Sequence, residues 1–354
     1  MSLHNRIVYW YRVLHRYNSF RSEVGLLEFQ NPGTDAPVFV SGNYAHTTDQ
    51  LIEVLRNFPC RLLVADSAGI NVWCASGVGD FNENKIIDAI EAVNLSEKVT
   101  TRRLILPPLC AAGVELSKIR KETGFSTVWG PMNLDDIPEY IQNNFRKSEK
   151  MLRADFPFRD RFENAIGVIG VFALSILLWP LFHRKVFRFL RSVSIVSLVT
   201  FLAYDRIPAK YPANKALQVG FVQTAISLIS GLVKRSPGLF ANILTDWLGI
   251  IIFAIDMIGS TPFYKTTIFH WFTTGNNESL FQPAVTSKCI GCGACLEVCP
   301  KGIFSRTPEK KIFADVTKSC CECLACVKQC PANAVENSGA GFKNDVRSVK
   351  IVNK

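Results

Sequence analysis

The sequence has few cysteines before its C-terminal region, where its metal-binding chemistry is concentrated. Only Cys60, Cys74 and Cys110, of 12 cysteines, precede residue 289. No Gly-x-Gly-x-x-Gly follows a predicted strand, so a nicotinamide-binding domain is unsupported. The first residues also lack the apolar core and cleavage site of a secretory signal. These absences exclude a disulfide scaffold and favour a reducing compartment, with the cytoplasm as the expected location of both ends of the chain.

The composition combines positive charge with long apolar segments. The 354 residues carry a formal net charge of +10, and 48% of them are hydrophobic. Because clustered cations near apolar segments attract anionic headgroups, we expect membrane lipid, and not nucleic acid, as a partner. The length leaves room for two or three domains.

A basic, aromatic segment, residues 1–34, comes first. On a helix over residues 5–18, one side would carry apolar and aromatic residues and the other side arginines. The apolar side comprises Ile7, Trp10, Tyr11, Leu14 and Tyr17, with Arg12 and Arg16 opposite. Two interpretations remain open: a helix lying in the membrane interface, or an edge helix packed on its own domain.

Residues 35–160 alternate between short apolar runs and amphipathic segments. The runs at 38–40, 62–65, 104–106 and 126–129 predict strands. The segments at 48–57, 113–121 and 136–143 predict helices, as does the segment after Asp80 and Glu83, a pair that suggests a capping box. This alternation predicts an α/β domain with a doubly wound, largely parallel sheet.

One stretch of this domain, residues 71–77, follows the second predicted strand. It therefore lies at the carboxyl edge of the sheet, where α/β proteins bind ligands. If Asn71 caps a short helix, Cys74 lies in its first turn, where N–H groups and the helix dipole favour thiolate. Such a thiolate beside Trp73 is a soft metal ligand; a small buried hydrophobe is the alternative.

Residues 161–273 are dominated by apolar segments. Four of them, 165–182, 192–204, 216–233 and 239–259, predict an α-helical transmembrane domain, with a soluble helical bundle as the alternative. Asp246 and Asp256 would be costly in lipid, so we expect them to face the interior, either to serve a pathway or, as we favour, to pair with Lys234, Arg235 or main-chain donors. Four spans would keep both flanking domains on the cytoplasmic side of a multi-pass inner-membrane protein.

The last segment, residues 274–354, contains a duplicated cysteine motif. Cys-x2-Cys-x2-Cys-x3-Cys-Pro occurs twice, offset by 320 − 289 = 31 residues. This is the spacing of bacterial two-cluster ferredoxins, in which the fourth cysteine of each run binds the other cluster. Cys289, Cys292, Cys295 and Cys330 should therefore hold one [4Fe–4S] cluster, and Cys320, Cys323, Cys326 and Cys299 the second.

Other residues of the motif refine this prediction. Gly291 and Gly293 allow the backbone to turn tightly and to direct N–H groups at sulfur. Zinc is the alternative metal, but the doubled motif with both prolines favours clusters. Cys321 has no ligand role in this scheme; it is a spare or packed thiol, or else a substrate contact.

Three stretches resemble the corrinoid protein family of bacterial mercury methylation, HgcA, and more distantly the corrinoid subunit of acetyl-CoA synthesis. They are Val38–Tyr44, Gly69–Ala75 and Arg103–Leu109 followed by Gly113-Val114. The resemblance implies that Cys74 is the lower axial ligand of a corrinoid cobalt. It further implies that the corrinoid is contacted by Asn71, Val72, Trp73, Ala75, Gly77, Gly42 and Asn43.

The chain as a whole resembles that corrinoid protein joined to its two-cluster ferredoxin partner, HgcB. The resemblance implies a corrinoid-dependent methyltransferase in which a fused ferredoxin reduces cobalt to Co(I). It also implies a methylated folate or a methyltransferase as methyl donor, a low-potential electron donor, and Hg(II) as methyl acceptor.

The sequence departs from this family where mercury would be handled. Residues 339–343 and the tail 351–354 contain no cysteine at the places where the family's extra thiols occur. Val78 stands where the family's cap motif has lysine. We therefore expect an acceptor other than mercury. The rival hypothesis is a membrane-anchored electron-transfer protein of ferredoxin type without corrinoid catalysis.

Overall fold

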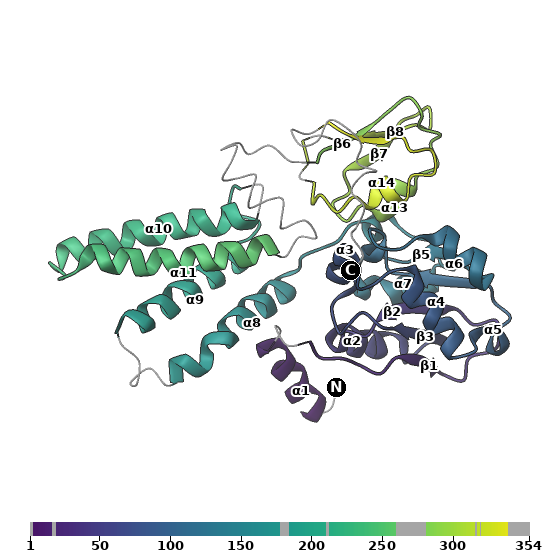
Figure 1. Ribbon diagram of the computed structural model, residues 1–354, viewed down its shortest axis with the longest axis horizontal. Coiled ribbons are helices and arrows are strands. Elements are labelled where there is room, and N and C mark those ends of the chain that lie inside the picture. Colours follow the sequence, from purple (N-terminus) through teal and green to yellow (C-terminus); the bar gives the residue numbers. More distant parts are fainter. Residues whose placement is uncertain are drawn as a thin grey trace. The chain divides into compact units, whose positions relative to one another are not determined.

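The computed structural model describes residues 3–15, 19–177, 184–209, 212–259, 281–315, 317–318 and 320–338. The chain divides into two compact units, shown in Figure 1. One unit is helical and contains residues 1–18 and 156–260; the other contains residues 19–155 and 261–354. The segment predicted as residues 1–34 is thus shared between the units.

The second unit is built on a five-stranded sheet of order β1-β3-β2-β4-β5. Its strands are β1 (Gly25–Phe29), β2 (Val38–Gly42), β3 (Cys60–Ala65), β4 (Arg103–Leu106) and β5 (Ser126–Trp129). β2 pairs in parallel with β3 and β4, and β4 in parallel with β5. The four predicted strands and the largely parallel sheet are therefore confirmed. β3 lies on one side of β2 and β4 lies on the other, so the order of the strands changes direction at β2. In α/β sheets, ligands bind at the carboxyl ends of the strands beside such a switch point.

The two faces of the sheet carry separate apolar cores. In β3, Leu63 and Ala65 belong to one core and Leu62 and Val64 to the other, because successive strand side chains point to opposite faces. Helices cover both faces, as the doubly wound prediction requires. The first face is covered by α3 (Val72–Val78), α4 (Glu83–Ala92) and α6 (Leu116–Thr123), and the second by α2 (Ala45–Leu55) and α7 (Ile137–Gln142).

The sequence interpretation missed β1, which adds an antiparallel edge. β1 pairs with β3 from Gly25↔Val64 to Phe29↔Cys60. The buried Arg61 anchors this edge: its Nε donates to Glu28 Oε1 at 2.7 Å and its Nη1 donates to Gly33 O at 2.7 Å. A charge is tolerated there because its donors are paired.

The helix boundaries differ from prediction by a few residues, and one cap differs in identity. The predicted capping box of Asp80 and Glu83 is wrong. The cap of α4 is Asn82, whose Oδ1 accepts from the N–H groups of Asn84 and Lys85. Short elements complete the domain: α5 (Leu95–Lys98), η1 (Pro108–Cys110), η2 (Leu134–Asp136) and η3 (Glu149–Leu152).

The C-terminal part of this unit is a small two-ribbon fold. β6 (Pro283–Val285) pairs with β9 (Val335–Asn337), and β7 (Phe304–Arg306) pairs with β8 (Ile312–Ala314), both antiparallel. The cysteine runs lead into two short helices, α13 (Ala294–Val298) and α14 (Ala325–Lys328). Residues 339–343 and 351–354, from which the family's extra thiols are missing, lie outside the described residues.

The helical unit contains α1 (Leu3–Leu14), α8 (Phe158–Leu177), α9 (Arg184–Leu202), α10 (Pro212–Val233) and α11 (Leu239–Gly259). The four helices expected between residues 161 and 273 are present, although residues 178–182 of the first lie outside the description. Among the described residues, one helix, Ala213–Val233, is long and apolar enough to cross a membrane, and the apolar part of α11, Leu239–Ala254, is shorter.

The N-terminal helix α1 uses one side for packing and exposes the other. Tyr9 and Val13 are buried, and Tyr9 Oη accepts a hydrogen bond from Arg159 on α8 at 2.9 Å. Ile7, Trp10 and Tyr11 are exposed. The buried side of α1 fits an edge helix packed on its own unit. The exposed apolar and aromatic side also allows α1 to lie in a membrane interface.

Asp246 lies in the interior of the helical unit, as expected, but its partner is not one of those proposed. Its side chain is fully buried, and Arg188 Nη2 on α9 donates to its Oδ2 at 2.5 Å. Lys234 and Arg235 were therefore the wrong partners. The side chain of Asp256 lies outside the described residues. This ion pair links α9 to α11, and it gives the buried carboxylate the charged partner that burial requires.

Candidate functional site

The first candidate site lies at the carboxyl edge of the sheet, where β2 ends at Gly42 and Asn43 follows. Asn43 is buried, and its Oδ1 accepts from Ser67 N, Ser67 Oγ and Gly69 N at 2.9–3.1 Å. A side chain on Gly42 would meet Ser67 Oγ at 2.5 Å. These two predicted contact residues therefore hold the loop that follows β3 in place.

That loop leads into α3, which presents Cys74. Asn71 is the N-cap of α3, and its Oδ1 accepts from Trp73 N at 2.9 Å. The predicted cap is thereby confirmed, and Cys74 occupies the third helical position, in the first turn. Val72 and Ala75 are buried in the core, whereas Cys74 is exposed and Trp73 is half-buried. The alternative of Cys74 as a buried hydrophobe is excluded.

A carboxylate stabilises the same loop. Asp66 Oδ1 accepts from Ala68 N at 3.0 Å and from Asn43 Nδ2 at 3.1 Å, and Lys85 Nζ lies 3.1 Å from its Oδ2. Burial alone would raise the pKa of Asp66, but these donors and the Lys85 charge lower it overall. Asp66 is therefore ionised at neutral pH, and it fixes the loop by charge.

The loop after β4 lies against α3 from the other side. A side chain on Gly113 would meet Ser76 Cα at 2.8 Å and Phe81 O at 2.6 Å. Such an approach is possible only for glycine. The structure thus brings together three predicted segments: the end of β2, the Asn71–Gly77 stretch and the loop containing Gly113.

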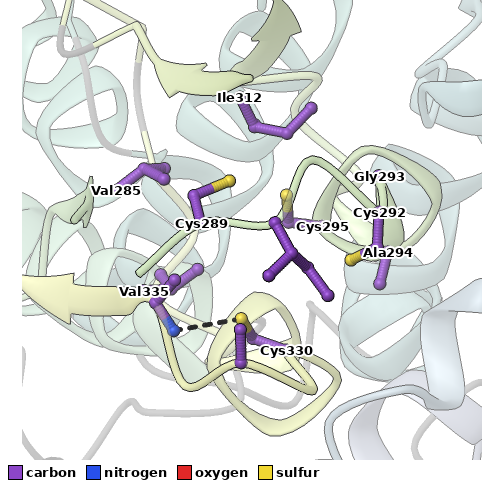
Figure 2. A pocket seen from close by; sticks show the side chains of 12 residues that line it. Val285, Cys289, Cys292, Gly293, Ala294, Cys295, Ile312, Cys330 and Val335 are labelled. Carbon is purple, nitrogen blue, oxygen red and sulfur yellow. Dashed lines mark hydrogen bonds between the residues drawn. The ribbon is translucent and has the colours of Figure 1, made fainter. Parts of the chain in front are cut away.

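The second candidate site is a cavity lined by the first predicted cysteine set. Cys289, Cys292, Cys295 and Cys330 all line it, as Figure 2 shows, with Ile312 and Val335 among the apolar residues around them. Cys330 comes from the second run and the other three from the first. The exchange of fourth cysteines that the spacing predicts is thus present in the structure.

The third candidate site is a cavity lined by the second set. Cys320, Cys323 and Cys326 line it together with Cys299 from the first run. Cys321, which the spacing left without a ligand role, also lines this cavity and is half-buried.

Both cysteine sets have the chemistry of cluster ligands. Cys289 Sγ accepts from Gly291 N at 3.4 Å, and Cys320 Sγ accepts from Glu322 N at 3.2 Å, two positions related by the 31-residue repeat. Such N–H···S contacts stabilise cluster thiolates. Each set brings four cysteines to one cavity, and the doubled spacing with both prolines favours [4Fe–4S] clusters over zinc.

The sequence interpretation missed the contact between the cysteine-rich domain and the α/β domain. Lys328 Nζ donates to Gly113 O at 2.7 Å, and Gln329 Nε2 donates to Ala111 O and Val114 O at 2.8 Å each. Cys323 belongs to the same apolar core as α3. The helix of the second cysteine run therefore docks on the loop that also contacts α3.

The first run is anchored as well, on a different part of the α/β domain. Lys147 Nζ lies 3.1 Å from Glu297 Oε2 on α13, and Ala154 N donates to Pro300 O at 2.9 Å. Glu297 and Lys328 occupy equivalent repeat positions, because 328 − 297 = 31. The same position of the duplicated motif therefore anchors both runs, through the negative Glu297 in the first and the positive Lys328 in the second.

The remaining cysteines are poorly suited to binding a metal from solution. Cys60 is fully buried, and burial raises its pKa to about 12. Cys110 is also fully buried, and burial raises its pKa further. Both thiols stay protonated near neutral pH and have no access to solvent.

The fold and these sites define the class of the protein: an α/β ligand-binding domain joined to a dicluster ferredoxin-type domain. Comparison with known families agrees. Residues 18–141 match the family described as CO dehydrogenase/acetyl-CoA synthase delta subunit, and residues 288–335 match the 4Fe-4S dicluster domain.

Individual relatives match the α/β part of the chain. The gamma subunit of the acetyl-CoA decarbonylase/synthase complex from Archaeoglobus fulgidus is 33% identical over 129 residues, 36% of this chain and 27% of that protein. The corrinoid/iron-sulfur protein large subunit of Moorella thermoacetica is 29% identical over 127 residues, 35% of this chain and 28% of that protein. The chain thus spans only about a quarter of the length of these curated relatives.

Proposed function

We propose that this chain is a membrane-anchored, corrinoid-dependent methyltransferase that carries its own electron donor. The observation that supports it best is Cys74: an exposed thiol on an Asn71-capped helix, at the carboxyl edge of a sheet whose relatives include a corrinoid/iron-sulfur protein. The two cysteine sets in the same chain provide the iron–sulfur part.

The residues of the α/β domain divide into those that would meet a corrinoid and those that position them. Cys74 would hold the cobalt of a bound corrinoid, and its place in the first turn of α3, near N–H groups, favours the thiolate that a soft metal needs. Trp73 would shield the thiolate from water, and Asn71 fixes the start of the helix. Gly42 and Asn43 hold the loop behind it. A bound corrinoid would supply a cobalt centre that accepts and donates a methyl group.

The cysteine-rich domain would hold two [4Fe–4S] clusters. Cys289, Cys292, Cys295 and Cys330 would hold the first, and Cys320, Cys323, Cys326 and Cys299 the second. Such clusters supply single electrons at low potential. Fusing them to the α/β domain raises the effective concentration of reductant without a separate docking equilibrium.

For the methyl group we propose a methylated folate or a methyltransferase as donor and an acceptor other than Hg(II). Mercury has to be taken from competing thiols by soft, accessible thiolates. Cys60 and Cys110 are buried with raised pKa values, and Cys321 alone would be a weak trap. In cells where this gene replaces an authentic methylation pair, we expect little methylmercury; wild-type yield would contradict this.

We propose that α8–α11 anchor the chain as four spans of the inner membrane, with both flanking domains cytoplasmic. α10 and α11 leave large apolar side chains exposed over much of their length. They include Phe221, Val222, Ile226, Ile229 and Leu232 on α10 and Phe240, Leu244 and Leu248 on α11. An apolar surface of this extent requires lipid or a partner. Recovery of the chain in the aqueous fraction after alkaline extraction of membranes would contradict the anchor.

The central test is metal analysis of the full chain, purified anaerobically in detergent. We expect cobalt, iron and sulfide together. Cys74→Ala should keep the iron and the fold, because exposed substitutions cost little, and should change the optical spectrum of the bound corrinoid. Cys60→Ala, on the opposite face of the sheet, is the matched control and should leave the spectrum unchanged. Iron and sulfide without cobalt would instead identify an electron-transfer protein.

A further inference from the structure

The ferredoxin-type domain has one side that the α/β domain covers. All four cysteines of the second set are buried, and Cys323 packs in the core that contains α3. The side chains of Lys328 and Gln329 fasten this side to three carbonyl groups of residues 111–114. No protein partner can reach the second set along this covered side without first displacing these contacts.

The first cysteine set, in contrast, is open to solvent at Cys292. Cys292 is exposed, whereas its repeat equivalent Cys323 is 9% exposed. Its neighbour Ile290 is 69% exposed, although isoleucine is among the residue types most often buried. An exposed ligand beside an exposed apolar side chain is the arrangement that a redox partner can contact.

Cations lie on one side of this opening. Arg306 Nη1 donates to Gly291 O at 2.8 Å, and its Nη2 would lie 2.7 Å from a Cβ on Gly293, so the guanidinium spans the loop that carries Cys292. Lys310 and Lys311, in the turn between β7 and β8, are exposed, and Lys310 O lies against Gly291. This turn therefore lies directly beside the first cysteine set.

The charge of this turn favours one sign of partner. Arg306, Lys310 and Lys311 are opposed by one carboxylate, Glu309. The backbone N–H of Glu309 and the Thr307 hydroxyl lower the pKa of that carboxyl, so it is ionised at neutral pH and the turn keeps a net positive charge. We call Ile290, Cys292, Arg306, Lys310 and Lys311 the entry face.

We propose that the entry face docks an acidic, one-electron carrier protein. Complementary charge would steer the carrier, and Ile290 would give the apolar contact at which the two redox centres approach. This proposal rests on the proposed function, because it assumes a cluster held by the first cysteine set. One electron passes from the carrier, which is oxidised, to that cluster, which is reduced; no covalent bond changes and no proton is required.

The test uses an acidic flavodoxin as the probe and the full chain in detergent. Binding of oxidised flavodoxin is measured by titration calorimetry at low and high salt, so that it reports docking without electron transfer. The double variant Lys310→Glu/Lys311→Glu should weaken binding on the order of tenfold at low salt and remove most of its salt dependence. Carbodiimide, which joins lysines to carboxylates, should cross-link flavodoxin at Lys310 or Lys311.

The control is Lys98→Glu/Lys121→Glu, which makes the same change of charge on exposed positions of the α/β domain. It should leave binding within about twofold. Reduction of the iron–sulfur absorbance by reduced methyl viologen, which does not need a docking face, should be the same in both variants. The proposal is overturned if the Lys310→Glu/Lys311→Glu variant binds flavodoxin as tightly as the wild type. It is also overturned if the control variant weakens binding as much as the Lys310→Glu/Lys311→Glu variant does.

Iron and sulfide analysis of the same samples separates this claim from the proposed function. If the clusters are present and the Lys310→Glu/Lys311→Glu variant binds flavodoxin as well as the wild type does, only the proposal of the entry face is overturned. A purified chain without clusters would overturn the proposed function and, with it, the entry face.

Discussion

The two halves of the cysteine array have the same spacing but different surroundings. The first set contains one exposed and two half-buried cysteines, Cys292, Cys289 and Cys330, whereas the second set is buried throughout. The difference comes from the α/β domain, which covers the second half through α14. A duplicated sequence motif has thus acquired two different environments, one closed and one open.

The backbone shows a second difference. The first half uses Gly291 and Gly293 at φ of +72° and +85°, whereas the equivalent residues of the second half are Glu322 and Leu324, both at +57°. A side chain in this region costs about 1–2 kcal/mol. In the second run, Glu322 and Leu324 hold the left-handed conformation at a steric cost. In the first run, Gly291 and Gly293 adopt it without that cost. Within the loop of the second run, Leu324 packs against the core of the ferredoxin-type domain and Cys323 lies in the core that contains α3.

Removing one cysteine from each half should give the largest contrast. Cys323→Ser should lose about half of the iron and also lower the stability of the α/β domain, because Cys323 packs in its core. Cys292→Ser should lose a similar share of the iron and leave that stability unchanged, because Cys292 is exposed. Iron analysis and thermal unfolding of both variants measure the contrast. Equal unfolding temperatures would show that the halves are equivalent.

The anchors of the two halves should differ in strength. Lys328→Met/Gln329→Leu removes three hydrogen bonds to carbonyls of one loop, which together contribute about 2–3 kcal/mol. Hydrogen exchange of residues 110–115 should then become faster.

The matched control is Glu297→Gln, at the equivalent repeat position. Its ion pair with Lys147 is partly exposed, so its loss should cost less than about 1 kcal/mol. Unchanged exchange in the Lys328/Gln329 double variant would mean that the docking depends on apolar contacts alone.

The loop glycine gives the smallest and most local test. Gly291→Ala would place a methyl group 2.3 Å from Lys310 O in a left-handed conformation, so we expect a loss of about 2 kcal/mol in the free energy of unfolding. Glu322→Ala, at the equivalent position, keeps its Cβ and adds no backbone clash, so its effect comes only from the loss of the buried Glu322 side chain. Chemical denaturation of the two variants compares them directly. A tolerated Gly291→Ala would remove the backbone difference between the halves.

The sequence was sufficient for the elements that depend on local pattern. The runs at 38–40, 62–65 and 104–106 became parallel strands because buried strands read as continuous apolar segments. The run at 126–129 is half-buried and was recognised from its β-branched and aromatic residues. The edge strand Gly25–Phe29 was missed because it contains Glu28 and is partly exposed along its length. The cap of α4 was misassigned because Asn82 lies just two residues from Asp80, and both residue types cap helices.

The features of the sites that depend on local sequence were predictable, and those that depend on contacts between distant residues were not. The cysteine sets were predictable because ligand spacing is a local property, and the cap at Asn71 could be inferred from its position after a strand. The contact of Lys328 with Gly113 could not be foreseen. It joins residues 215 positions apart, and a lysine at the end of a short helix normally indicates a solvated surface. The roles of Cys74 and of the corrinoid contacts stay predictions.

The pairing of α1 with α8 has a consequence for the order in which the chain is made. Tyr9 meets Arg159, 150 residues later, so α1 leaves the ribosome long before its partner exists. At a typical rate of synthesis this interval is roughly 10–30 seconds, within which the whole α/β domain can fold. During that time the newborn helix would expose Tyr9 and Val13 as well as Ile7 and Trp10. A nascent chain with such a helix can settle on a lipid surface before any of its later helices is synthesised.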